Sequence, residues 1–437
     1  MVISQGAFAV MIFTDRYFMS QISSTHIAAS LGGGVASFFS FCFFTGLLSY
    51  ANALAAQYFG AGEKSKCSIV LTQGLIITVL SIPLLVLISF LVVGIFSRMG
   101  HDPQMEALES TYYLILMAGS VITLAKICLS SYFAGIGRTS VVMVCDVLGL
   151  ILNIPLCYVM VFGKLGFPAL GIVGAGISTI VATAFSLLLF FAYYLAKKNR
   201  IEFSVMSSFV FHRQIFRRFL RLGFPSGMEI FLNVAAFNLF LLMFQSYGIA
   251  QAASAAIVFN WDILSFVPMM GLNIGVISLI GRFVGAGNME KTDEVISAGF
   301  VLGLGYAAVL ASIFIVFRFQ LVDVFAPPVG DFTATRALSA FMMIGLSCYV
   351  TADAIILVAG GVLRGAGDTK WLMYSSTLLH WLMLAAQYVI IMVLQLGPKA
   401  SWWAFVVMII TIAVVFVWRL QGGRWRDPKV LARVMAN

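Results

Sequence analysis

Long apolar segments recur along the whole chain, separated by short stretches that hold most of the charged residues. A helix of about 20 apolar residues is long enough to cross the roughly 30 Å hydrocarbon layer of a bilayer. The pattern therefore predicts an all-α polytopic membrane protein with twelve spans, at residues 1–21, 28–54, 68–97, 108–133, 140–162, 169–196, 222–246, 251–278, 294–317, 337–362, 371–396 and 400–420.

Composition and charge narrow the class further. Of the 437 residues 61% are hydrophobic and 10% are charged, whereas soluble domains carry roughly 25% charged residues. A soluble enzyme, a disordered protein and a nucleic-acid-binding protein are thereby excluded. Nineteen Lys and Arg residues fall in loops on the side of the N-terminus or in the C-terminal tail, and five fall in loops on the other side. Because cytoplasmic loops of membrane proteins are enriched in Lys and Arg, the net charge of +9 reflects the orientation of the chain in the membrane. We expect both termini in the cytoplasm and the chain in the inner, or plasma, membrane.

The second half of the chain repeats motifs of the first in the same order. Gly60-Ala61-Gly62 returns as Gly285-Ala286-Gly287, at an offset of 225 residues. Further pairs are Ala28-Ala29-Ser30 with Ala252-Ala253-Ser254, residues 135–139 with 365–369, and Leu165-Gly166 with Leu396-Gly397. Because each half has an even number of spans, the repeats should be related by a pseudo-two-fold axis along the membrane normal.

These repeats define four regions. We expect an N-lobe at 1–196, a basic cytoplasmic linker at 197–221, a C-lobe at 222–420 and a basic cytoplasmic tail at 421–437. A cavity for a transported molecule would lie between the lobes. An offset of 224 residues, as between Ala28 and Ala252, also places Met1 opposite Pro225. The first half then has no counterpart of residues 212–222, which indicates a shortened chain or a start codon placed too far downstream.

Ionisable residues inside spans are costly, at about 2.5 to 3.5 kcal/mol each on insertion scales, and are candidates for function. Asp15 in the first span could exchange a proton or bind Na⁺, with Asn153 and Thr179 as neutral ligands; its alternative is an ion pair with Arg16. Glu229 and Asn233 share a helix face. Together with Asp262 and Asp353 they could form a second cation or proton site; the alternative is that each carboxylate has its own hydrogen-bond partners among Ser, Thr and backbone groups. Asp146 is expected to face a loop, and Lys126 and His380 to be structural. One candidate Na⁺ site lies at Asp15, and the other lies at Glu229 together with Asp353.

The chain contains none of the sequence motifs for ATP hydrolysis, a nucleophilic serine or a zinc protease site. We therefore expect neither an enzyme nor a nucleotide-binding protein. Transport against a gradient would then need an ion gradient.

Several motifs together resemble the multidrug and toxic compound extrusion (MATE) family. They are Asp15, Ala28-Ala29, Ala56-Gln57 with Gly60-Ala61-Gly62, residues 135–139, Asn153-Ile154-Pro155, residues 166–174, Gly223-Phe224-Pro225 and residues 363–369. The resemblance implies a twelve-helix antiporter that expels organic cations in exchange for Na⁺ or H⁺. It also implies that Asp15, Asn153 and Thr179 match the N-lobe ion site, and that Asp353 matches a carboxylate of the NorM-like branch.

The chain departs from that family pattern at two positions. Cys157 stands where the family often has Asp, and Asn233 stands where NorM-like members have Glu, with Glu229 one turn earlier. The expected function is export of small organic cations by a monomer without cofactors, in a lipid bilayer. The alternative is a flippase for lipid-linked precursors, but such a cavity should be rich in Lys and Arg, and here the intramembrane acids outnumber the bases.

Overall fold

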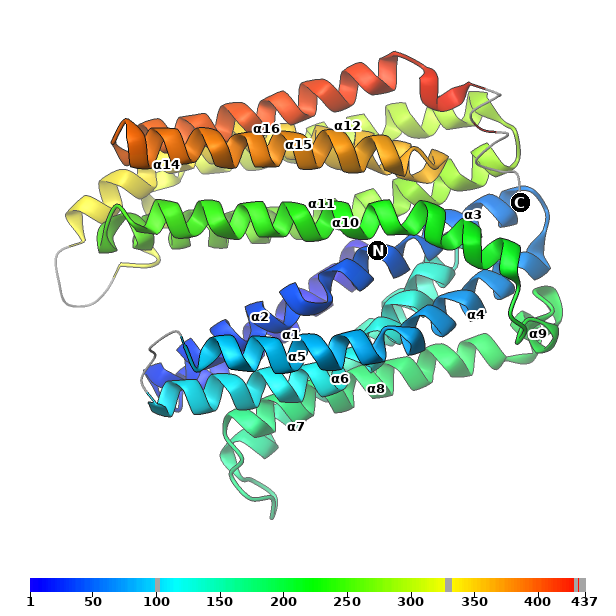
Figure 1. Cartoon of the computed structure of the whole chain (residues 1–437), viewed down its shortest axis with the longest axis horizontal. Coiled ribbons are helices and arrows are strands. Elements are labelled where there is room, and N and C mark those ends of the chain that lie inside the picture. The colour runs from blue at the N-terminus through cyan, green and yellow to red at the C-terminus, as the bar shows by residue number, and fades with distance from the viewer. Residues whose placement is uncertain (99–102, 327–331, 428–430, 432–437) are drawn as a thin grey trace.

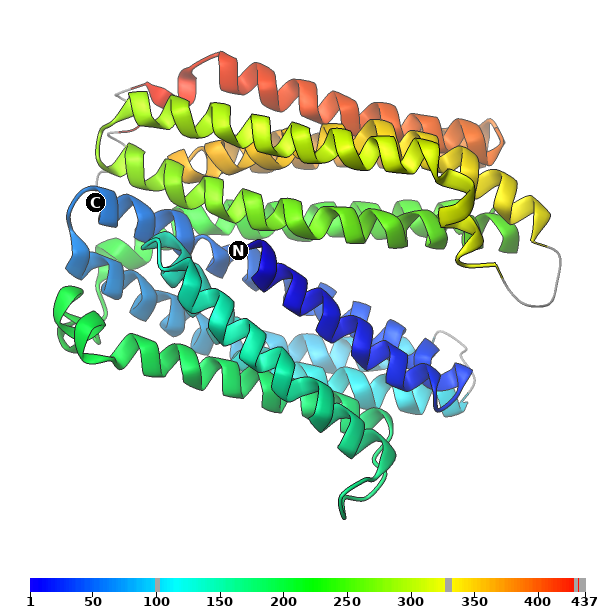
Figure 2. The same cartoon turned by 180° about the vertical axis from the view of Figure 1, so that it is seen from behind.

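The computed structural model describes residues 1–98, 103–326, 332–427 and 431, and within these ranges the regular elements are helices. Figures 1 and 2 show two groups of helices that lie together at the end where α3 is labelled and diverge toward the opposite end. The N-lobe comprises α1 (Val2–Ser20), α2 (Ser24–Ser49), α3 (Ala51–Gly60), α4 (Lys64–Leu80), α5 (Ile82–Phe96), α6 (Pro103–Gly135), α7 (Thr139–Phe162) and α8 (Ile172–Leu195).

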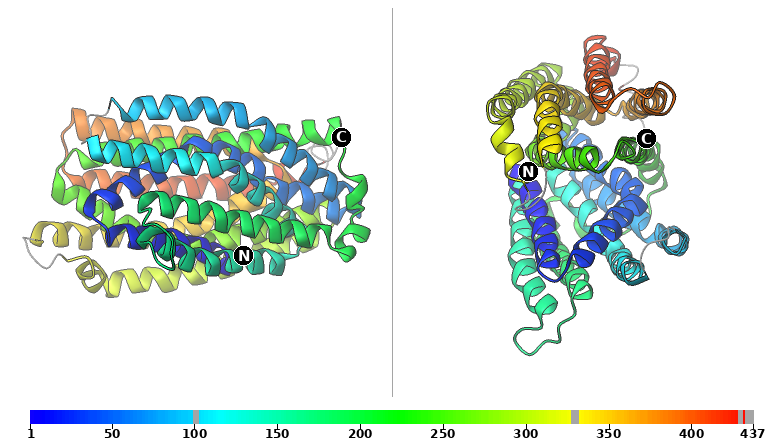
Figure 3. Two further views of the ribbon diagram at one scale, coloured as in Figure 1. Left: turned by 90° about the horizontal axis from the view of Figure 1, so that it is seen from below. Right: turned by 90° about the vertical axis from the view of Figure 1, so that its left-hand side faces the viewer.

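The C-lobe comprises α10 (Arg213–Gln245), α11 (Ile249–Gly285), α12 (Met289–Val316), α13 (Arg318–Asp323), α14 (Thr333–Ala366), α15 (Thr369–Tyr388), a π-helical turn (Val389–Val393) and α16 (Pro398–Gln421), followed by a 3₁₀ turn (Arg424–Arg426). Along the chain, the segment that connects the two lobes contains α9 (Lys197–Glu202) and a 3₁₀ turn (Val205–Ser207). The two views of Figure 3 show the long helices of both lobes from the side and nearly end-on.

In the described part of the chain, eleven helices or continuous helix pairs are long and apolar enough to cross a membrane. The pairs are α2 with α3, α4 with α5, and α15 with the π-helical turn. Pro83 at the start of α5 accompanies the break between α4 and α5, because proline cannot donate a helical hydrogen bond. The first predicted span corresponds to α1, whose 19 residues include Asp15 and Arg16. The polytopic all-α prediction is confirmed.

Several predicted boundaries were wrong. The spans placed at 28–54 and 251–278 continue to Gly60 and Gly285, and the polar residues Gln57 and Ser278 near these ends are buried and donate hydrogen bonds to the other lobe. Gln57, for example, is fully buried. The linker placed at 197–221 ends earlier, since α10 begins at Arg213. His212 caps that helix by accepting a hydrogen bond from the Ile215 amide at 3.4 Å.

The two lobes meet along a seam of glycines that follows the internal repeat. A β-carbon on Gly60 would overlap the backbone of Arg282, and one on Gly285 would overlap the backbone of Gln57. Gly60 and Gln57 lie 225 residues before Gly285 and Arg282, so the two contacts involve equivalent positions of the internal repeat. A second repeat-related pair of close approaches lies within the lobes: a β-carbon on Gly135 would be 2.5 Å from the Asn52 carbonyl oxygen in the N-lobe, and one on Gly365 would be 2.9 Å from that of Ile277 in the C-lobe.

Hydrogen bonds between the lobes reinforce the seam. The Gln57 amide donates to the Gly365 carbonyl at 2.8 Å and accepts from Arg218 at 2.9 Å. Ser278 of α11 donates to the Ala134 carbonyl of α6 at 2.7 Å. The lobes are thus closed against each other at the end that carries the Lys- and Arg-rich loops.

At the same end, Glu202 of α9 joins three elements of the N-lobe. Its carboxylate accepts from Lys64 at 2.9 Å and from Arg138 at 2.6 Å, and Arg138 also donates to Asn199 at 2.9 Å. The hydrogen bond from Lys64 and the nearby positive charges lower the pKa of Glu202 below its ordinary value of 4.5. The carboxylate therefore stays charged at neutral pH and holds α9 against the helix ends.

Replacing Glu202 by Gln is expected to lower stability slightly at neutral pH, by no more than about 1 kcal/mol, because the network is partly exposed. A lowered pKa in the folded state gives a contribution that is present above about pH 4.5 and is lost as the pH falls through the lowered pKa. The melting temperatures of wild type and Glu202→Gln, measured from pH 7 downward, should therefore converge at acidic pH. A gap that persists or widens in acid would contradict this role.

Candidate ion-coupling sites and family membership

The N-lobe candidates converge on the Asp15 carboxylate. Asp15 is buried on α1, and its Oδ2 accepts a hydrogen bond from the Thr179 hydroxyl of α8 at 2.6 Å. Asn153 and Cys157, one turn apart on α7, are fully buried and face the same carboxylate. The structure thus brings together the three N-lobe residues singled out in the sequence.

The polar atoms around Asp15 are not all satisfied by protein partners. Asp15 Oδ1 and both side-chain polar atoms of Asn153 are buried without a hydrogen-bond partner in the described structure. Such orphaned atoms are costly unless a ligand, ion or water meets them. The donor set of one carboxylate and two neutral oxygens suits a proton or a hard cation such as Na⁺, whereas the Cys157 sulfur is a poor ligand for Na⁺.

The C-lobe candidates divide into two groups. Asp262 of α11 and Asp353 of α14 are close enough for their carboxylates to interact electrostatically, and Tyr349, one turn before Asp353, lies beside Asp262. Neither carboxylate forms an ion pair with a Lys or Arg of the described residues. This pair is the C-lobe arrangement that most resembles the Asp15 site.

Glu229 does not form the expected site with Asp353. Its carboxylate accepts from Arg364 at 2.6 Å, and that arginine lies near the end of α14. Asp353 precedes Arg364 by eleven residues, which separates them by about 16 Å along the helix. The structure therefore pairs Glu229 with Arg364 and does not bring it together with Asp353. Within the described residues, no group of three or more His, Cys, Asp or Glu side chains could hold a metal ion.

Asn233 and His380 both meet Ser376 of α15. The Asn233 amide donates to the Ser376 hydroxyl at 2.8 Å, and His380 Nδ1 lies 2.8 Å from the Ser376 carbonyl oxygen. The first contact joins α10 to α15, one turn from Glu229, whereas the second lies within α15. Asn233 thus takes part in packing between helices on the face that it shares with Glu229.

The Glu229 and Arg364 pair is expected to be structural. Replacing Glu229 by Gln should destabilise the protein by about 3–5 kcal/mol, because it leaves a largely buried arginine without its countercharge. Thermal unfolding in detergent would measure this, with Glu229→Gln/Arg364→Met as the matched double variant that removes both charges. The double variant should recover much of the loss. Unchanged stability in the single variant would contradict the prediction.

Sequence reasoning missed one charged pair inside the N-lobe. Lys126 of α6 and Asp146 of α7 form an ion pair at 2.8 Å, and Ser4 of α1 donates a hydrogen bond to the same aspartate. The expectation that Asp146 faces a loop was wrong. The available signal was depth: Asp146 lies seven residues after the start of α7, and Lys126 lies nine residues before the end of α6, so both are at a similar depth in the bundle.

A protein-family model matches each of the two halves of the chain. The family model described as MatE matches residues 1–159 and 225–390, one stretch in each lobe. The chain belongs to the MatE family. The two matched stretches begin 224 residues apart, which agrees with the offset between the repeated motifs.

Individual relatives of this MatE chain are similar over nearly its entire length. "Probable multidrug resistance protein NorM" of Pasteurella multocida is 28% identical over 95% of this chain and 90% of its own length. "Multidrug resistance protein MdtK" of Edwardsiella ictaluri is 26% identical, over 98% of this chain and 94% of its own. A solved MOP superfamily transporter from Pyrococcus furiosus has a TM-score of 0.88 at 19% identity, covering 98% of this chain and 94% of that one, and it shows the same fold.

Proposed function

We propose that this protein is a secondary active antiporter that exports amphipathic organic cations in exchange for Na⁺ or H⁺. The observation that carries the proposal is the MatE match in both lobes, together with relatives that are named as multidrug resistance proteins and aligned over nearly their whole length. The antiporter would act as a monomer, without nucleotide or nucleic acid. It would lie in the inner, or plasma, membrane with both termini in the cytoplasm.

The charges inside the bundle support a cationic cargo. Asp15, Asp262 and Asp353 are carboxylates without an ion-pair partner among the described residues, and a surplus of negative charge in an enclosed region attracts cations. Lys126 and Arg364, which a flippase would need for a lipid pyrophosphate, are instead paired with Asp146 and Glu229. This charge distribution favours the antiporter over the flippase.

The fold suggests how the exchange would proceed. The two lobes are closed at the glycine seam, so this structure would expose the space between them on the side away from the basic loops. An ion that binds at Asp15 or at Asp262 and Asp353 would neutralise buried charge, which changes the relative stability of the two lobe arrangements. A ligand shifts such an equilibrium only through its different affinity for the two states.

Efflux from bacterial cells that lack their own drug pumps tests the proposal. Cells that produce the protein should accumulate less ethidium than control cells, and a protonophore or Na⁺-free medium should abolish the difference, depending on the driving ion. Equal accumulation, with the protein present and folded in the membrane, would contradict cation export. If vesicles containing the protein moved a fluorescent lipid pyrophosphate instead, the flippase would be the better account.

A further inference from the structure

The ion pair between Lys126 and Asp146 lies inside the N-lobe and has a third member on α1. Lys126 and Asp146 are 18% and 11% exposed, and Ser4, which donates to Asp146, is buried. A hydrogen bond to a charged acceptor is stronger than one between neutral groups. Three helices, α1, α6 and α7, are thus joined by one polar cluster.

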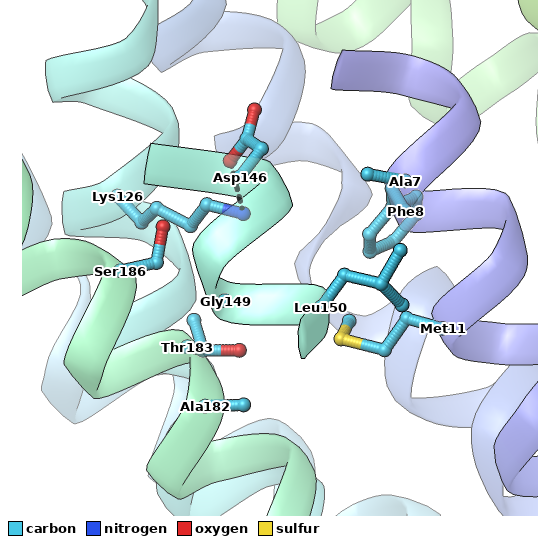
Figure 4. Close-up of a pocket in the computed structure, with 10 residues that line it drawn as sticks. All are labelled: Ala7, Phe8, Met11, Lys126, Asp146, Gly149, Leu150, Ala182, Thr183 and Ser186. Carbon is cyan, nitrogen blue, oxygen red and sulfur yellow. Dashed lines mark ion pairs between the residues drawn. The ribbon is translucent and has the colours of Figure 1, made fainter. Parts of the chain in front are cut away.

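Beside this cluster lies a small cavity that borders α1. Figure 4 shows Ala7, Phe8 and Met11 of α1 on one side of the cavity, and Lys126 and Asp146 joined across from them. Thr183 and Ser186 of α8 complete the polar part of the lining. Side chains that face a void lack packing partners there. Packing alone therefore leaves this part of α1 less well fixed than a close-packed helix.

Side-chain hydrogen bonds tie α1 to the N-lobe at two levels. Ser4 contacts Asp146, and Asp15, eleven residues or about 16 Å further along the helix, contacts Thr179. The first turn of α1 also contacts the other lobe, because a β-carbon on Gly271 of α11 would lie 2.6 Å from the Val2 Cα. The start of α1 is thus held between the N-lobe cluster and a helix of the C-lobe.

We propose that Ser4, Asp146 and Lys126 keep α1 attached to the N-lobe while the lobes move, and so position Asp15 against Asn153 and Thr179 for the coupling ion. Lys126 holds the Asp146 carboxylate in place through the ion pair, and Asp146 holds Ser4. All three are positioning residues, since none of them contacts Asp15. The proposal rests on the antiport function proposed above and assigns the Lys126 and Asp146 pair a part in it.

The variant Ser4→Ala tests this role because it removes the attachment of α1 and leaves the ion pair intact. Transport of ethidium into everted vesicles would be measured against the concentration of the driving ion. Ser4→Ala should raise the KM for that ion about tenfold, the equilibrium effect of losing one hydrogen bond to a charged group. The KM for ethidium should stay unchanged, and the melting temperature should fall by no more than a few degrees, because the lost hydrogen bond also stabilises the folded state. Ser4→Thr, which keeps a hydroxyl, should stay within about twofold of wild type.

The matched control is Ser20→Ala, on the same helix, because the Ser20 hydroxyl donates only to the Tyr17 carbonyl of its own helix, at 2.7 Å. It should behave as wild type. Ser4→Ala kinetics equal to those of Ser20→Ala would overturn the positioning role while leaving antiport intact. A rise in the KM for ethidium equal to that for the ion would also overturn it, because the effect would then not be specific to ion coupling. An absence of ion-driven transport in the wild type would instead overturn the proposed function itself.

Discussion

Asp15→Asn is expected to abolish ion-driven transport, lowering the initial rate by well over tenfold, or more than about 1.4 kcal/mol. Asparagine has nearly the same shape and can still accept the hydrogen bond that Thr179 donates to Asp15 at 2.6 Å. It carries no charge, however, so it can neither exchange a proton nor neutralise Na⁺. The initial rate of ethidium uptake into everted vesicles, with an imposed pH or Na⁺ gradient, measures the effect.

The control for this variant is Asp323→Asn. Asp323 pairs with Arg336 through two hydrogen bonds at 2.5 and 2.8 Å on an exposed part of the C-lobe, outside the spans. It should transport like wild type, which separates the loss of a carboxylate in general from the loss of the buried one. If Asp15→Asn transported at the wild-type rate with the same ion dependence, coupling would have to reside elsewhere, with Asp262 and Asp353 as the remaining candidates.

Gly285→Ala is expected to prevent the lobes from closing at the seam. The added methyl group would overlap the Gln57 backbone, and overpacking of this kind costs about 1–3 kcal/mol or more. Only the closed arrangement bears this cost, so the population should shift toward lobes that are open at this end. Transport should fall strongly, because exchange requires both arrangements.

Spin labels at Ser65 and Lys291, on the seam-side ends of the two lobes, can measure this shift. Gly285→Ala should lengthen the distance between the labels, and Gly60→Ala should do the same because the contact is reciprocal. The matched control is Gly275→Ala, on the same helix α11, where a β-carbon would meet no atom within 4 Å. Unchanged distances and transport in both seam variants would show that the glycine contacts do not control closure.

Much of the architecture could be predicted because apolar length and charge asymmetry act locally along the chain. The repeat also pairs Gly60 with Gly285 by offset, although the sequence does not show that each of them meets the backbone of the other lobe. The ends of α3 and α11 could not be placed from hydropathy, since the polar Gln57 is buried by the opposite lobe. Burial of this kind depends on tertiary contacts that a single sequence does not show.

The candidate sites were predictable only in part, for a related reason. Asp15 with Thr179 follows from a family pattern, but which acids of the C-lobe meet depends on their depth and on the face of each helix. Glu229 lies in the middle of α10 and Arg364 lies two residues before the end of α14, yet their side chains meet at 2.6 Å. Counting residues from the span ends pairs Lys126 with Asp146, but it also places Glu229, seven residues into the span at 222–246, at nearly the depth of Asp353, nine residues before the end of the span at 337–362.

The most direct test of antiport is whether the cargo drives the ion. Purified protein in liposomes would be loaded with an organic cation such as tetraphenylphosphonium, without any imposed ion gradient, and internal pH and Na⁺ would be followed with fluorescent indicators. We predict that outward movement of the cation drives H⁺ or Na⁺ inward, and that Asp15→Asn abolishes this movement. Cation release with no counter-movement of either ion in the wild-type protein would contradict coupled exchange.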